Sequence, residues 1–183
     1  MSIGLKRGTV AIEPHKVEWE ISAQKIISIL KDVLKEDMID AQHIGSTSIK
    51  SICAKPIVDI VVGVSCFEKI MKYNDVLNEK GIIYRREDHP NQHLYVCGDL
   101  ENEIHTHYIH VVIWEQESWN NYLNMRDYLN THEDRAKEYA ELKERLAKEY
   151  PEDRVAYTNG KAMFIEEILR CAGEWRKTQI DIN

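Results

Sequence analysis

The chemistry of this sequence centres on one carboxylate, Asp59, within the apolar residues 57–64. The β-branched residues around it are typical of a strand buried on both faces, and Asp is disfavoured in such strands. A buried ionised carboxylate requires a cation, a metal ion or several hydrogen-bond donors, because burying it unpaired is very costly. Carboxylate oxygen is also a ligand that Mg²⁺ prefers. Asp59 is therefore a candidate metal ligand or general base, and the alternative is a structural carboxylate capped by loop N–H groups.

An anion-binding loop precedes this carboxylate. It consists of Gly45, Ser46, Thr47 and Ser48. Such small residues let backbone N–H groups point toward one place, and Lys55 adds a cation between the loop and the strand. Together with Asp59 they predict a site for a phosphorylated, metal-bound ligand. The structural alternatives are a serine-capped turn and a solvated lysine.

Histidines supply further candidates. His43 lies just before the loop, and His105, His107 and His110 lie in residues 104–114, which have the pattern of a strand. A period of two puts His105 and His107 on one face and His110 on the other, unless a β-bulge intervenes. Imidazoles here can act as metal ligands or acid–base groups. The alternative is hydrogen-bonded strand histidines on a half-exposed face.

A sheet must position these side chains, and the hydrophobic pattern predicts one. Strands are expected over residues 9–12, 38–44, 57–64, 82–86, 93–97 and 104–114. Helical spacing predicts helices over residues 16–35 and 67–78, the second ending near Gly81. Short turns at residues 88–91 and 98–99 join the last three strands, which are therefore expected to be antiparallel.

From Ser118 onward the pattern is helical. Helices are expected over residues 119–130, 133–150 and 155–171. Ser118 would cap the first of them and Gly173 would end the last, with residues 177–183 frayed. The charges of the middle helix, Lys143 among them, predict a solvated face with ion pairs four residues apart.

These elements predict an α/β (α+β) fold, with a mixed sheet of about five strands flanked by helices and a helical C-terminal third. At 183 residues the chain suits a single domain with a real core. We expect that domain to span residues 1–183, with the sheet core at about residues 9–115 and the C-terminal helices at about 118–172.

Composition excludes several classes of function. The net charge of -7 argues against broad nucleic-acid binding, which relies on clustered Lys and Arg. The four cysteines form no C-x-x-C pair, so neither a zinc knuckle nor a redox motif is indicated. No apolar run has the length of a membrane span, and the N-terminus lacks the apolar region of a signal peptide. We expect a cytoplasmic protein with no membrane partner; the oligomeric state is left open.

Four segments carry a family likeness. They are HIGSTSIKSICAKPIVDIVVGV at residues 43–64, HTHYIHVV at 105–112, WNNYLNMRDYLNTH at 119–132 and YTNGKAMFIEEIL at 157–169. In this order they resemble the GrpB family of bacteria, an uncharacterised protein family, from about residue 9 to about residue 171. The resemblance implies a nucleotidyltransferase-like fold related to polymerase-β-type enzymes.

The resemblance also implies a chemistry. In the wider superfamily the loop grips a nucleoside triphosphate, and strand carboxylates hold two Mg²⁺ ions for in-line transfer. Gly45, Ser46 and Asp59 match that pattern. Val61 stands where the acidic–apolar–acidic triplet has its second acid, on the same strand face as Asp59, which puts a two-metal site in doubt.

Other site residues follow from the matched segments. His107 and His110 occupy the strand where the superfamily's third acid would lie, so either would serve as a metal ligand or acid–base group. A His/Asp site favours Mn²⁺ or Zn²⁺ over Mg²⁺. Arg126 and Lys161 would approach the phosphates from the helices. Arg86, in the pair Arg85-Arg86, is a further phosphate candidate, and surface ion pairing is the alternative for Arg126 and Lys161.

The sequence thus predicts a nucleotidyltransferase-like protein that binds a nucleotide or other phosphorylated small molecule with a divalent metal ion. An enzyme of this type would catalyse nucleotidyl or phosphoryl transfer. One alternative is a catalytically degenerate nucleotide-binding or regulatory module. Another is a metal-dependent hydrolase that uses Asp59 and the strand histidines.

Overall fold

A mixed six-stranded sheet forms the middle of the molecule. The computed structural model describes residues 3–89 and 91–180, without the side chains of residues 86–90 and 180. The strands are β1 (Leu5–Lys6), β2 (Asp40–Ile44), β3 (Val58–Val64), β4 (Ile83–His89), β5 (Gln92–Asp99) and β6 (Ile104–Ile113). Their order is β2-β3-β6-β5-β4, with β1 paired to β6. Only β3 and β6 are parallel neighbours, so the predicted mixed sheet is confirmed.

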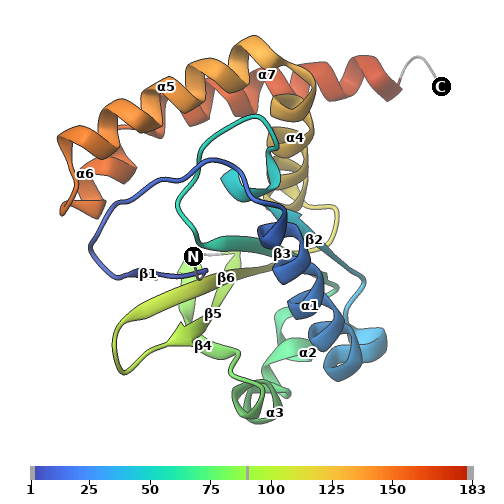
Figure 1. Ribbon diagram of the computed structural model, residues 1–183. Helices are drawn as coiled ribbons and strands as arrows, with labels where there is room; N and C mark the ends of the chain where they lie inside the picture. Colours follow the sequence, from blue (N-terminus) through green and yellow to red (C-terminus); the bar gives the residue numbers. More distant parts are fainter. Residues whose placement is uncertain (1–2, 90, 181–183) are drawn as a thin grey trace.

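Helices cover both faces of the sheet (Figure 1). One side carries α1 (Val17–Leu34), α2 (Phe67–Met71) and α3 (Asn74–Glu79). The other side carries α4 (Glu117–Thr131), α5 (Glu133–Glu149), α6 (Arg154–Asn159) and α7 (Ala162–Ile180). Within the described residues, no helix is both long and apolar enough to cross a bilayer.

Strand β3 divides its side chains between these two layers. Val58, Ile60 and Val62 belong to the main core, which α1 closes from one side. Val61 belongs instead to a cluster with Trp119 of α4 on the other side. Because side chains alternate along a strand, Asp59 shares the face of Val61 and points toward α4–α7.

Two predictions in the N-terminal half are wrong. Residues 9–12 form no strand: Thr9 donates to the carbonyl of Lys6 in a turn, and the N–H of Val10 donates to the carbonyl of Pro151, between α5 and α6. The predicted helix 67–78 is two helices, because the chain turns at Tyr73, whose hydroxyl donates to Asp37 Oδ2 at 2.9 Å. The predicted turn 88–91 starts too early, because residues 88 and 89 lie in β4, and residue 90 lies outside the described residues.

The C-terminal predictions need three corrections. Helix α4 starts at Glu117 with Gln116 at its N-cap, so Ser118 lies inside the helix. The predicted helix 155–171 is interrupted at Gly160, which separates α6 from α7. Helix α7 then continues through Gly173 to Ile180, because its last turns pack against α4.

Candidate functional site

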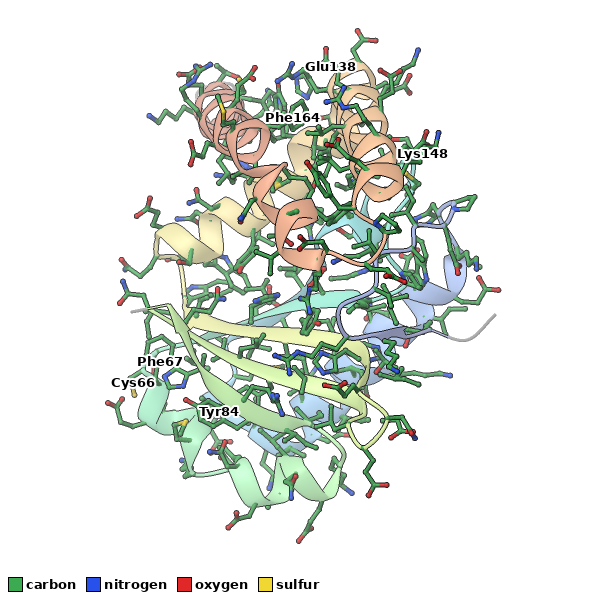
Figure 2. The ribbon with its side chains drawn as sticks, turned by 90° about the vertical axis from the view of Figure 1, so that its left-hand side faces the viewer. Cys66, Phe67, Tyr84, Glu138, Lys148 and Phe164 are labelled. Carbon is green, nitrogen blue, oxygen red and sulfur yellow. The ribbon has the colours of Figure 1, made fainter. Side chains whose placement is uncertain are left out.

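A cavity of about 360 Å³ lies between the sheet and the C-terminal helices. Its floor includes Asp59 of β3 with Tyr108 and His110 of β6. The loop after β2 forms one wall, and side chains of α4, α5, α6 and α7 form the others. Figure 2 shows this helical layer from the side, with Phe164 between α5 and α7 and with Glu138 and Lys148 on the outside of α5. Asp59 therefore lies at a junction of sheet, loop and helices.

Asp59 and His110 form a pair at this floor. Their strands run parallel, and Asp59 lies directly beside Tyr108, which puts His110 two residues farther along the same face. His110 Nε2 is 3.3 Å from Asp59 Oδ1. The Gln92 amide donates to His110 Nδ1 at 3.2 Å, so Nε2 carries the proton and donates it to the carboxylate. To ligate a metal through Nε2, His110 would need its other neutral tautomer, with the proton on Nδ1.

The loop packs directly against this carboxylate. Gly45 adopts a φ of +69°, and a Cβ there would lie 2.5 Å from Asp59 Oδ2. The next residues form the 3₁₀ turn η2 (Ser46–Ser48), closed by the Ser48 hydroxyl, which donates to Gly45 O at 2.7 Å. Gly45, Ser46 and Thr47 line the cavity, whereas Ser48 lines a neighbouring groove.

Cations dominate the rest of the lining. They are Lys55, Arg126, Lys143, Arg154 and Lys161, and Asp59 is the one carboxylate among the cavity's described lining residues. Burial is the main cause that lowers the pKa of Lys55 and Lys161 to about 8 and that of Lys143 to about 7. Neighbouring cations lower each of these pKa values further. The cavity thus concentrates positive charge that its own side chains do not balance.

Lys143 corrects a prediction. It is not on a solvated face: the residue is 1% exposed, and its Nζ donates to the carbonyl of Cys53. A signal for this was present in the sequence, because Lys143 lies four residues after Tyr139 and three before Leu146. Both of these belong to the buried stripe of α5. The charge of Lys143 by itself predicts a solvent-exposed side chain, but its position in the helical period predicts a side chain on the buried face of α5.

Arg154 was also missed. It begins α6, and its guanidinium carbon lies 5.3 Å from the ring centre of Tyr108 in the cavity floor. The ring of Tyr157, one turn later, contacts two lysines: the Nζ atoms of Lys55 and Lys161 are 5.2 Å and 4.4 Å from its centre. The break at Gly160 lets α6 and Lys161 bring these cations to the cavity. No local signal marked that break as part of a site.

The other strand histidines point elsewhere. His107 Nε2 lies 2.9 Å from the hydroxyl of Ser22 in α1, on the opposite face of the sheet from Asp59. The β-bulge predicted as a possibility lies between His105 and His107, and it places His105 Nδ1 2.9 Å from the Tyr108 hydroxyl. The site therefore keeps His110 and leaves out His107.

The predicted arginines are also separated. Arg126 lines the cavity, and its Nη1 donates to Gln42 Oε1 at 3.1 Å and to His43 O at 3.2 Å. Asp127 accepts from its Nε at 2.8 Å, which fixes the guanidinium against β2. The Arg86 side chain lies outside the described residues, and its strand, β4, is at the far edge of the sheet from β2.

The site contains few metal donors. Val61, at the position of the superfamily's second acid, is fully buried beside Ile44 and Trp119. In residues 3–89 and 91–180, no group of three or more His, Cys, Asp or Glu side chains is placed to hold a metal ion. Asp59 and His110 are the two side chains at the cavity floor that could act as metal ligands. That number suits a cation whose other ligands are phosphate and water oxygens, as is usual for Mg²⁺.

The comparisons with known proteins all indicate the same family. The sequence model of the family described as GrpB protein matches residues 9–171. Glutamate-rich protein GrpB of Alkalihalophilus pseudofirmus is 39% identical over 91% of this chain and 98% of its own length. UPF0157 protein YqkA of Bacillus subtilis is 31% identical over 84% of this chain, which spans 44% of that relative. The crystal structure of conserved protein GrpB from Enterococcus faecalis superposes with a TM-score of 0.82 and 27% identity, covering 88% of this chain and 96% of that one.

Proposed function

The chain belongs to the GrpB family, and on that premise we propose that its cavity binds a nucleotide or another phosphorylated small molecule together with a divalent metal ion. The single observation that carries the proposal is the charge of the cavity. Five cationic side chains line the cavity, compared with one carboxylate. Of the cations, Arg126 already has a carboxylate partner in Asp127.

The lysines are suited to phosphate oxygens. Burial makes the charged form of each lysine costly, and a phosphate that accepts hydrogen bonds from it restores the lost stabilisation. Lys55 and Lys161 both contact the Tyr157 ring, so one phosphate chain could contact both. The backbone at Gly45 and Ser46 would hold a further phosphate beside Asp59.

Asp59 would hold the metal ion, with His110 as a second ligand. Mg²⁺ or Mn²⁺ suits a carboxylate and phosphate oxygens, and an imidazole ligand extends the choice to Zn²⁺. When bound, such an ion neutralises charge on the phosphate group that is transferred. The lysines would add to that neutralisation and keep the phosphates in place.

Two functions share this binding mode. Nucleotidyl or phosphoryl transfer would use Asp59 and the cations. A binding module without turnover is favoured by Val61, whose burial leaves the strand with one carboxylate where two-metal transfer uses more. A hydrolase built on Asp59 and several histidines is less favoured, since His107 faces α1.

Calorimetric titration tests the proposal. ATP, GTP and CTP are each titrated with Mg²⁺ and with Mn²⁺ into the parent and into Asp59→Asn, and the mixtures are assayed for products. We expect metal-dependent binding of at least one nucleotide, and a loss of affinity of at least about tenfold in Asp59→Asn because a charge-bearing ligand is removed.

The matched control is Asp75→Asn, on the exposed surface of α3, which should bind as the parent does. Unchanged affinity in Asp59→Asn, or no binding of any nucleotide by the parent, would contradict the proposal. Turnover would distinguish the transferase from the binding module.

A further inference from the structure

Lys143 is the one lysine, among those the structure describes, whose whole residue is buried. It nevertheless lines the cavity, so its side chain borders the space in which a ligand would lie. A buried amine beside a cavity is placed to react with a ligand and not with bulk solvent.

The surroundings of Lys143 do not hold it as a cation. In the described residues no carboxylate forms an ion pair with it, and its Nζ donates to a neutral acceptor, the carbonyl of Cys53. Lys55 and Lys161 repel its positive charge, while Glu144 and the Cys53 thiol act in the other direction. Its Nζ also lies 4.6 Å from the centre of the Tyr139 ring.

Burial and these cations lower the pKa of Lys143 to about 7. A substantial fraction of the residue is then a neutral amine near pH 7, and the neutral amine is the nucleophilic form. Lysines made neutral in this way by a desolvated or cationic environment are those that form Schiff bases with carbonyl compounds.

We propose that Lys143 is a covalent attachment site for a phosphorylated aldehyde bound in this cavity. Lys55 and Lys161 would hold the phosphate, and the cavity would bring the aldehyde carbon to the Lys143 amine. This goes beyond the proposed function, since it needs neither a nucleotide nor a metal ion.

The reaction balances without an oxidant or a reductant. The lone pair of Nζ attacks the carbonyl carbon, and the carbonyl oxygen takes up a proton to give a carbinolamine. The carbinolamine hydroxyl is then protonated and leaves as one water molecule. The nitrogen loses its remaining proton, and the C=N bond forms. The ammonium groups of the cavity are the available acids for this step.

Reductive trapping tests the inference. The full-length protein is incubated with pyridoxal 5′-phosphate, reduced with borohydride, digested, and mapped by mass spectrometry. We expect the reduced adduct on Lys143, with labelling at least about tenfold faster than with unphosphorylated pyridoxal, because two ammonium groups hold the phosphate. Tripolyphosphate should protect Lys143 by occupying the same cavity.

Lys148 is the internal control, because it is exposed on the same helix (Figure 2). Labelling of Lys148 equal to that of Lys143, labelling of Lys55 or Lys161 in place of Lys143, or equal reaction with pyridoxal would each overturn the inference. The mapping is done on the parent protein, so it does not depend on a variant that folds. Adduct formation without any nucleotide binding would support this inference while contradicting the proposed function.

Discussion

Gly45 and Asp59 lie so close that each restricts the other. The φ of +69° favours glycine at position 45, and Asp59 Oδ2 and Cβ occupy the space where a side chain would start, at 2.5 and 2.9 Å. The loop and the carboxylate therefore form one unit at the residue scale. A substitution in the loop should change the position of Asp59.

The variant Gly45→Ala tests this coupling. We expect a loss of about 1–3 kcal/mol in the free energy of unfolding, from the positive φ and from overpacking, measured by urea denaturation. Nucleotide affinity should fall at least about tenfold as Asp59 is displaced.

The matched control is Gly81→Ala. Its φ of +74° gives a similar backbone cost, but no atom lies within 4 Å of the added Cβ. It should be destabilised by about 1 kcal/mol and bind nucleotide as the parent does. Equal binding by both variants would show that the loop does not position Asp59.

Helix α7 shows at the element scale how packing overrides local preference. Glycine commonly ends helices, yet α7 runs through Gly173, because the residues beyond it contact α4. The Trp175 ring lies 6.0 Å from that of Tyr128, and Arg176 donates to Asn124 Oδ1 at 2.9 Å and to Asp127. The same Asp127 accepts from Arg126, so α7 supports a wall of the cavity.

Gly173→Ala should therefore stabilise the protein. A Cβ at this position has no atom within 4 Å, and alanine replaces glycine in a helix interior with a gain of about 0.5–1 kcal/mol. Thermal unfolding checks the sign, and nucleotide binding should stay unchanged. A lower melting temperature would mean that the chain is not helical at residue 173.

The cationic cavity affects the stability of the whole molecule. The folded-state pKa values of Lys55, Lys143 and Lys161 lie below the ordinary value of 10.5, so the unfolded chain binds more protons between about pH 7 and pH 10. Stability rises with pH wherever the unfolded state holds more protons. Below about pH 6 all three lysines are charged in both states, and the destabilisation is complete.

We expect the free energy of unfolding of the ligand-free protein to rise by about 1–3 kcal/mol from pH 7 to pH 9, as measured by urea denaturation. Lys143→Met should be more stable than the parent at pH 7 and should show a smaller rise. The exposed control Lys148→Met should keep the parent's rise. A flat or falling profile in the parent would contradict the charge distribution described for the cavity.

The sequence by itself determined the family, the helix–sheet–helix outline, and the loop and strand that bring Gly45 and Asp59 together. These depend on local properties: periodicity predicts elements, and small residues between two strands predict a tight loop. Alternation along β3 and β6 even placed His110 and His107 on opposite faces. The alternation of side chains does not show which of those two faces packs against the helical layer.

Only the tertiary structure decided the rest of the site. Lys143 and Arg154 line the cavity because α5 and α6 pack over the sheet face that carries Asp59, and no spacing within one element encodes that contact. The continuation of α7 through Gly173 likewise follows from packing between distant segments. Long-range packing outweighs local propensity because burial of apolar surface provides more free energy than one cap or one charge costs.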